Sequence, residues 1–305
     1  MPEGPEVRRY ADALSDALVG ARVVQLATRI RTAKAWLADH PDAFEGRHIE
    51  RIRSHGKHLI GHTDEGAFFH VHLMMWGRWQ IVAPDDPLVL ERDRRERARI
   101  ITPDVAALLM SAPMFNVGLG DPYAEVPILA TLGPDVLPEE GPFDVAGFRT
   151  RLADHAGRTV GAVLLDQTLV AGIGNYLRAE ILYACRIDPW RKVADLSEAD
   201  VACLAITIPD LSARAYRTGG RTVDDTDYQR LQTDADLVYQ PDRAWETRHY
   251  VFRRTNLPCL RCGDTIRQKR QVTRRTDDEE KTRIIYFCPT CQSTSVPLPK
   301  LNKTV

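Results

Sequence analysis

Two pairs of cysteines near the carboxyl end constrain this chain more tightly than any other feature of its sequence. Cys259 and Cys262 form one CxxC pair, and Cys288 and Cys291 form a second pair after 25 intervening residues. In a protein that is not exported, such pairs are metal ligands more often than redox dithiols or disulfides. Four thiolates favour tetrahedral coordination of a single structural Zn²⁺ ion, with no position left open for catalysis.

The composition is that of a globular protein, since hydrophobic residues make up 44% of the chain and charged residues 27%. At 305 residues the chain is long enough for two domains with separate cores. No apolar run approaches the ~20 residues that span a bilayer, and no basic and apolar leader is present. We therefore expect no export and no membrane contact. Cys185 and Cys203 lie in apolar, helical surroundings and are predicted to be inert core thiols.

The charge is unevenly distributed along the chain. The formal net charge is only −1, which argues against a general nucleic-acid coat protein. Residues 251–305 nevertheless hold twelve Lys or Arg against five Asp or Glu. A local surplus of this kind is typical of a phosphate-binding face on an otherwise balanced protein.

The pattern of apolar residues changes once along the chain. Short β-rich stretches separated by turns follow one another up to residue 111 and predict an antiparallel β-sandwich. A Gly- and Pro-rich linker comes next, and from Asp144 the spacing becomes helical. The predicted class is α+β multidomain, with these boundaries: sandwich 1–132, linker 133–142, helical domain 143–250 and zinc hairpin 251–305. The expected strands cover 23–26, 52–53, 58–60, 68–71, 79–82, 99–101 and 107–110.

The first residues combine a proline, acidic residues and a helix. After removal of Met1, Pro2 would have a free secondary amine, which can attack an electrophilic carbon and form an iminium. A terminal amine titrates near ~8, and the positive end of the following helix favours its neutral form. Glu3 places a carboxyl group next to it. The alternative is an ordinary helix start, with a proline in the first turn and acids that complement the dipole.

A second helix start carries glycines. Gly172-Ile173-Gly174-Asn175 precedes an apolar helical stripe. Glycines at such a junction let a phosphate approach the free N–H groups at the positive end of the helix. An N-cap role for Asn175 is compatible with the same spacing.

Taken together, these motifs resemble the formamidopyrimidine-DNA glycosylase/endonuclease VIII family, closer to its endonuclease VIII branch. The resemblance covers nearly the whole chain. It rests on Pro-Glu-Gly-Pro-Glu at 2–6, Gly-Lys at 56–57, Leu-Gly-Pro-Asp at 132–135, the helix-two-turns-helix string at 165–182 and the two CxxC pairs. It implies an enzyme that acts on damaged double-stranded DNA, uses no organic cofactor, and is a cytoplasmic monomer, associated with the nucleoid when bound to DNA.

The resemblance also implies roles for individual residues. Pro2 would be the nucleophile, Glu3 the acid, and Lys57 and Arg283 would assist catalysis at the DNA phosphates. Met75 would be the wedge that fills the space of an extruded nucleotide. The zinc hairpin is longer than usual in the family, so Arg274 or Arg275 could reach the DNA in place of Arg283. The implied DNA-binding set is Glu6, Met75, Gly174, Asn175, Arg274, Arg275 and Arg283.

The implied activity is that of a bifunctional DNA glycosylase and AP lyase of base excision repair, which cleaves the strand by β- and δ-elimination. Residues 111–115 lack the arginine that the purine-specific branch carries, so oxidised pyrimidines are the expected substrates. Met74 and Thr131 stand where endonuclease VIII proteins tend to carry polar or basic contacts, and they leave substrate choice open. Two alternatives remain: a non-catalytic damaged-DNA-binding protein of the same architecture, and a glycosylase for crosslinked or other unusual lesions.

Overall fold

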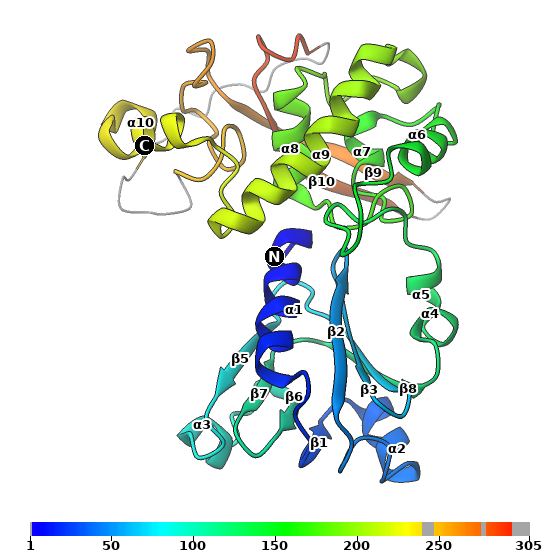
Figure 1. Ribbon diagram of the computed structural model, residues 1–305. Helices are drawn as coiled ribbons and strands as arrows, with labels where there is room; N and C mark the ends of the chain where they lie inside the picture. The colour runs from blue at the N-terminus through cyan, green and yellow to red at the C-terminus, as the bar shows by residue number, and fades with distance from the viewer. Residues whose placement is uncertain (1, 240–246, 276–278, 295–305) are drawn as a thin grey trace. The chain divides into compact units, whose positions relative to one another are not determined.

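The first helix, α1 (Gly4–Leu18), shows why the amino-terminal part of the chain is ordered. Its apolar stripe of Val7, Ala11, Leu14 and Leu18 is buried. Burial of such a stripe, rather than helix propensity, supplies most of the stability of a helix in a protein. In this computed structural model, which describes residues 2–239, 247–275 and 279–294, α1 belongs to the first of two compact units (Figure 1).

Unit 1 extends to Leu132 and includes 139–141. It contains two four-stranded antiparallel sheets, with strand orders β1-β6-β7-β5 and β2-β3-β4-β8. One core, built from α1 and residues of both sheets, confirms the predicted sandwich. The strands are β1 (Gln25–Thr28), β2 (Ile49–His55), β3 (His58–Thr63), β4 (Ala67–His72), β5 (Arg78–Val82), β6 (Glu96–Ile101), β7 (Ala106–Met110) and β8 (Met114–Leu119). The other helices are α2 (Arg31–Asp39), α3 (Pro87–Leu90), α4 (Pro122–Glu125) and α5 (Pro127–Ala130).

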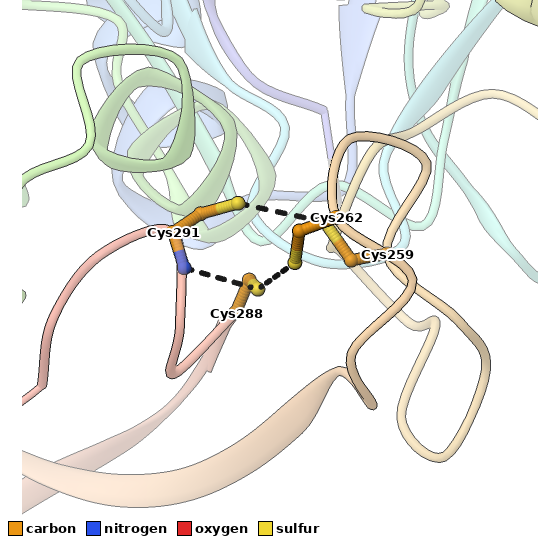
Figure 2. Close-up of side chains that lie close together, drawn as sticks. All are labelled: Cys259, Cys262, Cys288 and Cys291. Carbon is orange, nitrogen blue, oxygen red and sulfur yellow. Dashed lines mark hydrogen bonds between the residues drawn. The ribbon is translucent and has the colours of Figure 1, made fainter.

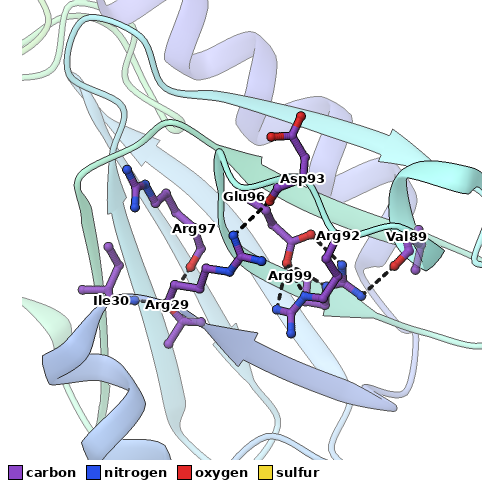
Figure 3. A network of polar contacts seen from close by, with 9 residues as sticks. Arg29, Ile30, Val89, Arg92, Asp93, Glu96, Arg97 and Arg99 are labelled. Atoms are coloured by element: carbon purple, nitrogen blue, oxygen red, sulfur yellow. Dashed lines mark hydrogen bonds and ion pairs between the residues drawn. The ribbon is translucent and has the colours of Figure 1, made fainter.

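A polar network joins β6 to α3 (Figure 3). Glu96 is buried, and its carboxylate accepts hydrogen bonds from Arg99 Nε at 2.8 Å and from Arg92 Nη2 at 2.9 Å. Arg99 Nη1 also donates to the carbonyl of Val89 at 3.1 Å. Burial alone would raise the pKa of Glu96, but the bonds from the two arginines outweigh it and hold the pKa below its usual value. The buried carboxylate therefore stays charged and paired.

The second sheet carries a row of histidines on one face. Strand register places His58 opposite His72 and His70 opposite Asn116. His58 Nδ1 lies 2.8 Å from His70 Nε2, and Asn116 Nδ2 lies 3.0 Å from His70 Nδ1. Both bonds form with neutral rings when Asn116 donates to His70 Nδ1 and His70 Nε2 donates to His58 Nδ1. The bonds of His58, His70 and Asn116 hold the three strands β3, β4 and β8 together.

Unit 2 is helical and includes a hairpin. Its main core is built from α6 to α9, β10 and two buried cysteines, and a smaller cluster forms around α10 and η2. Ser197 and Asp200 form a capping box at the start of the longest helix, α9, and Gly219 ends it at a φ of 72°. The elements are α6 (Val145–Ala153), α7 (Val160–Val163), α8 (Asn175–Ala184), η1 (Val193–Asp195), α9 (Glu198–Thr218), α10 (Asp225–Thr233), η2 (Ala235–Leu237), β9 (Arg267–Arg275) and β10 (Glu280–Phe287). The finer division into 133–142, 143–250 and 251–305 stays a prediction, and 295–305 lie outside the described residues.

One sequence prediction in unit 2 is wrong. Cys185, which caps α8, and Cys203 on α9 form a disulfide, so they are not free core thiols, and both are only half-buried. The two cysteines are 18 residues apart, and the antiparallel return of the chain through η1 brings them together.

Within the described residues, no helix combines the length and the apolar composition that a membrane span requires.

The histidine row predicts a specific acid sensitivity of unit 1. Burial, together with neighbouring histidines, lowers the pKa of His58 to about 2 and that of His70 to about 4. Both pKa values lie below that of an exposed histidine, so below pH ~6.5 the unfolded chain binds protons that the folded chain does not. The contribution of these neutral histidines to the free energy of unfolding is therefore fully present above pH ~6.5. It is lost as the pH falls toward 4, by about 1.4 kcal/mol per pH unit for each such histidine.

The measurement is urea unfolding between pH 7 and 4, followed for the unaltered chain and for His70→Gln. The glutamine cannot be protonated, so the variant is expected to lose stability less steeply by about 1.4 kcal/mol per pH unit. Equal slopes for the two proteins would contradict the assignment.

Candidate functional site

Two glutamates at the start of α1 hydrogen-bond reciprocally to the backbone of the first turn. Glu3 is the N-cap residue and is 2% exposed. Its backbone N–H donates to Glu6 Oε2 at 2.8 Å, and the two residues form a reciprocal capping box. Pro2 lies directly before Glu3 and is half-buried. The carboxylate of Glu3 is thereby fixed beside the residue that the sequence suggested as nucleophile.

Lys57 reaches the same region from the turn between β2 and β3. His55 pairs with His58, so the turn has only two residues, and Gly56 adopts a φ of 56° there. The Lys57 side chain is buried. Burial lowers the pKa of its amine, while the negative charges of Glu3 and Glu6 act in the opposite direction. These charge interactions place Lys57 close to both carboxylates, although some fifty residues separate them in sequence.

The turn between β4 and β5 carries the predicted wedge. Met75 is 58% exposed, and its neighbour Trp76 is 75% exposed. Large apolar side chains held in solvent indicate a contact surface. The sequence singled out Met75 and missed Trp76, because a tryptophan beside a strand is more often part of a core.

In unit 2, Gly174 and Asn175 mark the start of α8. Gly174 is the N-cap residue, so Asn175 is the first helical residue and the N-cap alternative for it is wrong. Asn175 Oδ1 accepts a hydrogen bond from Arg178 Nη2 at 2.7 Å. The same nitrogen donates to the carbonyl of Ile284 at 2.8 Å. One guanidinium therefore links the start of α8 to strand β10.

The register of strands β9 and β10 determines on which face of the hairpin each arginine lies. Arg283 lies opposite Gln271 and is exposed, whereas Gln271 is buried and donates to the carbonyl of Pro189 at 2.7 Å. Paired residues point to the same face of a sheet, so Arg283 belongs to the face that packs on the helices, next to Ile284 and the Arg178 link. Arg274 is exposed opposite Lys281, beside a bulge at the far end. The side chain of Arg275 lies outside the described part of the structure.

The segment after α9 begins with two glycines, Gly219 and Gly220, but hydrogen bonds hold the residues that follow in place. Thr222 is fully buried, and its hydroxyl donates to Glu180 Oε2 at 2.7 Å. The Glu180 carboxylate also accepts the three successive backbone N–H groups of 250–252, at 2.8 to 2.9 Å. Burial raises the pKa of Glu180, although these four donors favour its charged form. Glu180, which the sequence did not reveal as important, ties this loop to the segment that leads into the hairpin.

The four predicted metal ligands lie together (Figure 2). The sulfur atoms of Cys259, Cys262, Cys288 and Cys291 all lie within 4.8 Å of one another. Two of the distances are 3.8 Å, from Cys259 to Cys291, and 3.5 Å, from Cys262 to Cys288. Thiolates at about 2.3 Å from a tetrahedral ion are about 3.8 Å apart. The cluster therefore has the ligands and the spacing to hold a metal ion.

Comparison with known proteins agrees with this geometry. Residues 1–108 match the family described as Formamidopyrimidine-DNA glycosylase N-terminal domain, and residues 132–227 match Formamidopyrimidine-DNA glycosylase H2TH domain. Endonuclease 8 of Klebsiella pneumoniae subsp. pneumoniae is 32% identical over 292 residues, which are 96% of this chain and 100% of that protein. Endonuclease 8 of Salmonella arizonae is 32% identical over 297 residues, with coverages of 96% and 100%.

Solved structures share the fold. MutM in complex with carbocyclic 8-oxo-G containing DNA has a TM-score of 0.74 at 22% identity, covering 95% of this chain and 99% of that chain. Lactococcus lactis Fpg, in a complex with an abasic site containing DNA, has a TM-score of 0.73 at 22% identity, with coverages of 95% and 99%. The resemblance inferred from the sequence motifs is confirmed: the chain belongs to the formamidopyrimidine-DNA glycosylase/endonuclease VIII family, on its endonuclease VIII branch.

Proposed function

We infer that the protein is a DNA glycosylase and AP lyase of base excision repair. Family membership supports this class of enzyme. The structural observation that carries the inference is the buried group of Glu3 and Lys57 around the start of α1, directly beside Pro2. A lysine and a carboxylate buried together next to an amine are the groups that covalent amine chemistry at a sugar phosphate needs.

The proposed mechanism starts at the nitrogen of Pro2, once Met1 has been removed. An enzyme cannot reach C1′ inside the base stack, so the damaged nucleotide is first extruded. The Pro2 nitrogen attacks C1′, the bond from C1′ to the base breaks, and the base leaves with a proton. Glu3 supplies a proton at the sugar as the ring opens, which gives an iminium. The iminium acidifies the C2′–H, and water takes up that proton as the bond to the 3′ phosphate breaks in β-elimination. Loss of the C4′ proton to water then expels the 5′ phosphate in a second elimination, and hydrolysis of the remaining iminium frees the Pro2 nitrogen.

The remaining residues are proposed to hold the DNA. Lys57 would bind a phosphate next to the lesion and assist elimination, and Met75 would fill the space of the extruded nucleotide. Arg283 and Asn175 are proposed to bind phosphates from one surface of unit 2, because both lie next to the Arg178 link. The N–H groups around Gly174, at the positive end of α8, suit a phosphate.

DNA contacts are also proposed for Arg274, Arg275 and Glu6. Arg274, with Arg275 beside it in sequence, is an alternative phosphate contact at the far end of the hairpin. The Glu6 carboxylate caps the Glu3 N–H, so its proposed effect on DNA binding is exerted through the order of the helix start.

Two alternatives differ from this proposal in what they would do to DNA. A non-catalytic damaged-DNA-binding protein would bind lesions without forming an adduct. A glycosylase for crosslinked or other unusual lesions would form the adduct on those substrates alone. Borohydride trapping on a panel of damaged oligonucleotides separates all three. We further propose that the protein acts as a cytoplasmic monomer on damaged duplex DNA, without an organic cofactor and without membrane contact.

The cysteine cluster is proposed to bind a single structural zinc ion, held by Cys259, Cys262, Cys288 and Cys291. We predict stoichiometric zinc in the purified protein, and loss of zinc and of DNA binding in Cys259→Ser, because folding of such a hairpin is coupled to metal binding. Metal analysis and DNA titration are the measurements. The matched control replaces Cys185 and Cys203 together by serine and should keep the zinc. Zinc-free protein that binds DNA normally would contradict the proposal.

Substrate preference is predicted from residues 111–115, which lead into β8 and include its first two residues. This segment offers no arginine to the base left opposite the lesion. We expect dihydrouracil or thymine glycol to be excised roughly tenfold faster than 8-oxoguanine opposite cytosine, because a missing hydrogen-bonding group changes rates by at least that much. Single-turnover rates on matched duplexes measure this. Faster excision of 8-oxoguanine would reverse the assignment.

The nucleophile is tested by blocking the amine of Pro2. A chain with residues added before Pro2 has an amide nitrogen there, which cannot form an iminium, so the trapped adduct and strand cleavage at an abasic site should fall to background. Binding of the same abasic duplex should survive within about threefold, since its phosphate contacts are unaltered. Pro2→Gly is the matched control, because it keeps a terminal amine and residual activity. An intact extended chain that traps at the normal rate would identify an internal lysine as the nucleophile.

A further inference from the structure

The turn between β4 and β5 is closed too tightly for its middle residues to enter the core. Leu73 is buried at one end, and the N–H of Gly77 at the other end donates to the Leu73 carbonyl at 2.9 Å. A Cβ on Gly77 would lie 2.3 Å from that carbonyl oxygen, so only glycine fits. Met74, Met75 and Trp76 are consequently 43%, 58% and 75% exposed.

This turn has an unusual backbone at Met74. Its φ is 54°, a left-handed conformation that is unfavourable for a residue with a side chain. The N–H of Met74 donates to Nδ1 of His72 at 3.1 Å. A backbone N–H can only donate, so Nδ1 must be the unprotonated nitrogen, and the proton of the neutral ring sits on Nε2. His72 thus supplies the acceptor that stabilises the left-handed turn.

The ring of His72 is itself held in place. It packs edge-on against His58, with ring centroids 4.8 Å apart and an interplanar angle of 66°. His58 is fixed in turn by its bond to His70. Burial, and then the positive charge of Lys57, lower the pKa of His72 to about 4. The ring is therefore neutral near pH 7, and Nδ1 keeps the lone pair that accepts from Met74.

We propose that His72 is a positioning residue for base extrusion: its Nδ1 atom holds the Met74 N–H and so fixes the turn that presents Met75 to the DNA. The inference rests on the proposed function and deepens it, because His72 acts here through the backbone of Met74 and touches neither the base nor C1′. A wedge that is already ordered loses less conformational freedom when it enters the duplex. The competing explanation is a direct bond from His72 Nε2 to the DNA.

Two substitutions separate these explanations, since each replaces one ring nitrogen. The amide of His72→Asn lies near the position of Nδ1, whereas that of His72→Gln reaches the position of Nε2. Excision of dihydrouracil is measured in single turnover from a duplex and from the same oligonucleotide as a single strand, where no stack has to be opened. We expect His72→Asn to stay within about threefold of the unaltered chain on both, and His72→Gln to lose about tenfold on the duplex alone.

A double-mutant cycle with Met74→Gly tests the backbone argument. Glycine adopts the left-handed conformation without cost, so His72→Gln should cost less than about threefold on the duplex in that background. Loss with His72→Asn and retention with His72→Gln would overturn the proposal in favour of a direct Nε2 contact. Equal losses on duplex and single strand would overturn it in favour of a merely structural role.

Hydrogen exchange at the Met74 amide keeps the inference separate from the proposed function. The amide should exchange slowly in the unaltered chain and in His72→Asn, and about tenfold faster in His72→Gln, whether or not the protein excises any base. Fast exchange in all three proteins would overturn the proposal. A chain that shows the expected exchange but excises no lesion would refute the proposed function and leave the anchoring of the turn established.

Discussion

The buried N-terminus of α1 is the constraint on which the rest of unit 1 depends. The first residues of a domain usually fray, yet Glu3, Gly4 and Pro5 are all buried here. A buried lysine is costly unless opposite charge is near, and Lys57 has the carboxylates of Glu3 and Glu6 beside it. The same two carboxylates cap the helix. One small group of charges thus orders the chain start and makes burial of the lysine tolerable.

In unit 2, α8 plays the comparable part through two buried charges of opposite sign. Arg178 connects the start of the helix to β10, and Glu180 connects its middle to Thr222 and to the three N–H groups of 250–252. Segments more than a hundred residues apart are therefore ordered by one helix. Buried charges with several partners resist rearrangement, because losing one partner leaves a charge unsatisfied. Asn175 and Arg283 are held rigidly for the same reason, because Arg178 bonds to Asn175 and to Ile284 next to Arg283.

The sequence predicted elements whose signal is local and missed those whose signal depends on pairing. The CxxC pairs, the sandwich and the start of α8 follow from spacing along the chain. Strand β8 was missed because its run of Met114 to Leu119 mixes polar and small residues without alternation. The helices α3, α4 and α5 have four residues each, which is too short to show a helical stripe. The disulfide and the histidine row depend on which segments return beside each other, and no local pattern encodes that. For the site, a motif indicated Lys57, but its nearness to Glu3 is a property of the fold.

Strand register also sets the distance between two residues with proposed roles at the DNA, Lys57 and Met75. Lys57 immediately precedes β3, the wedge turn immediately follows β4, and His58 lies opposite His72 where these strands pair. A slip of one residue would turn every side chain to the other face, and the bonds that join His58, His70 and Asn116 oppose such a slip. A phosphate contact and a wedge must meet a duplex of fixed dimensions, so their spacing has to be rigid. Placing both at the ends of two paired strands, rather than on separate loops, provides that rigidity.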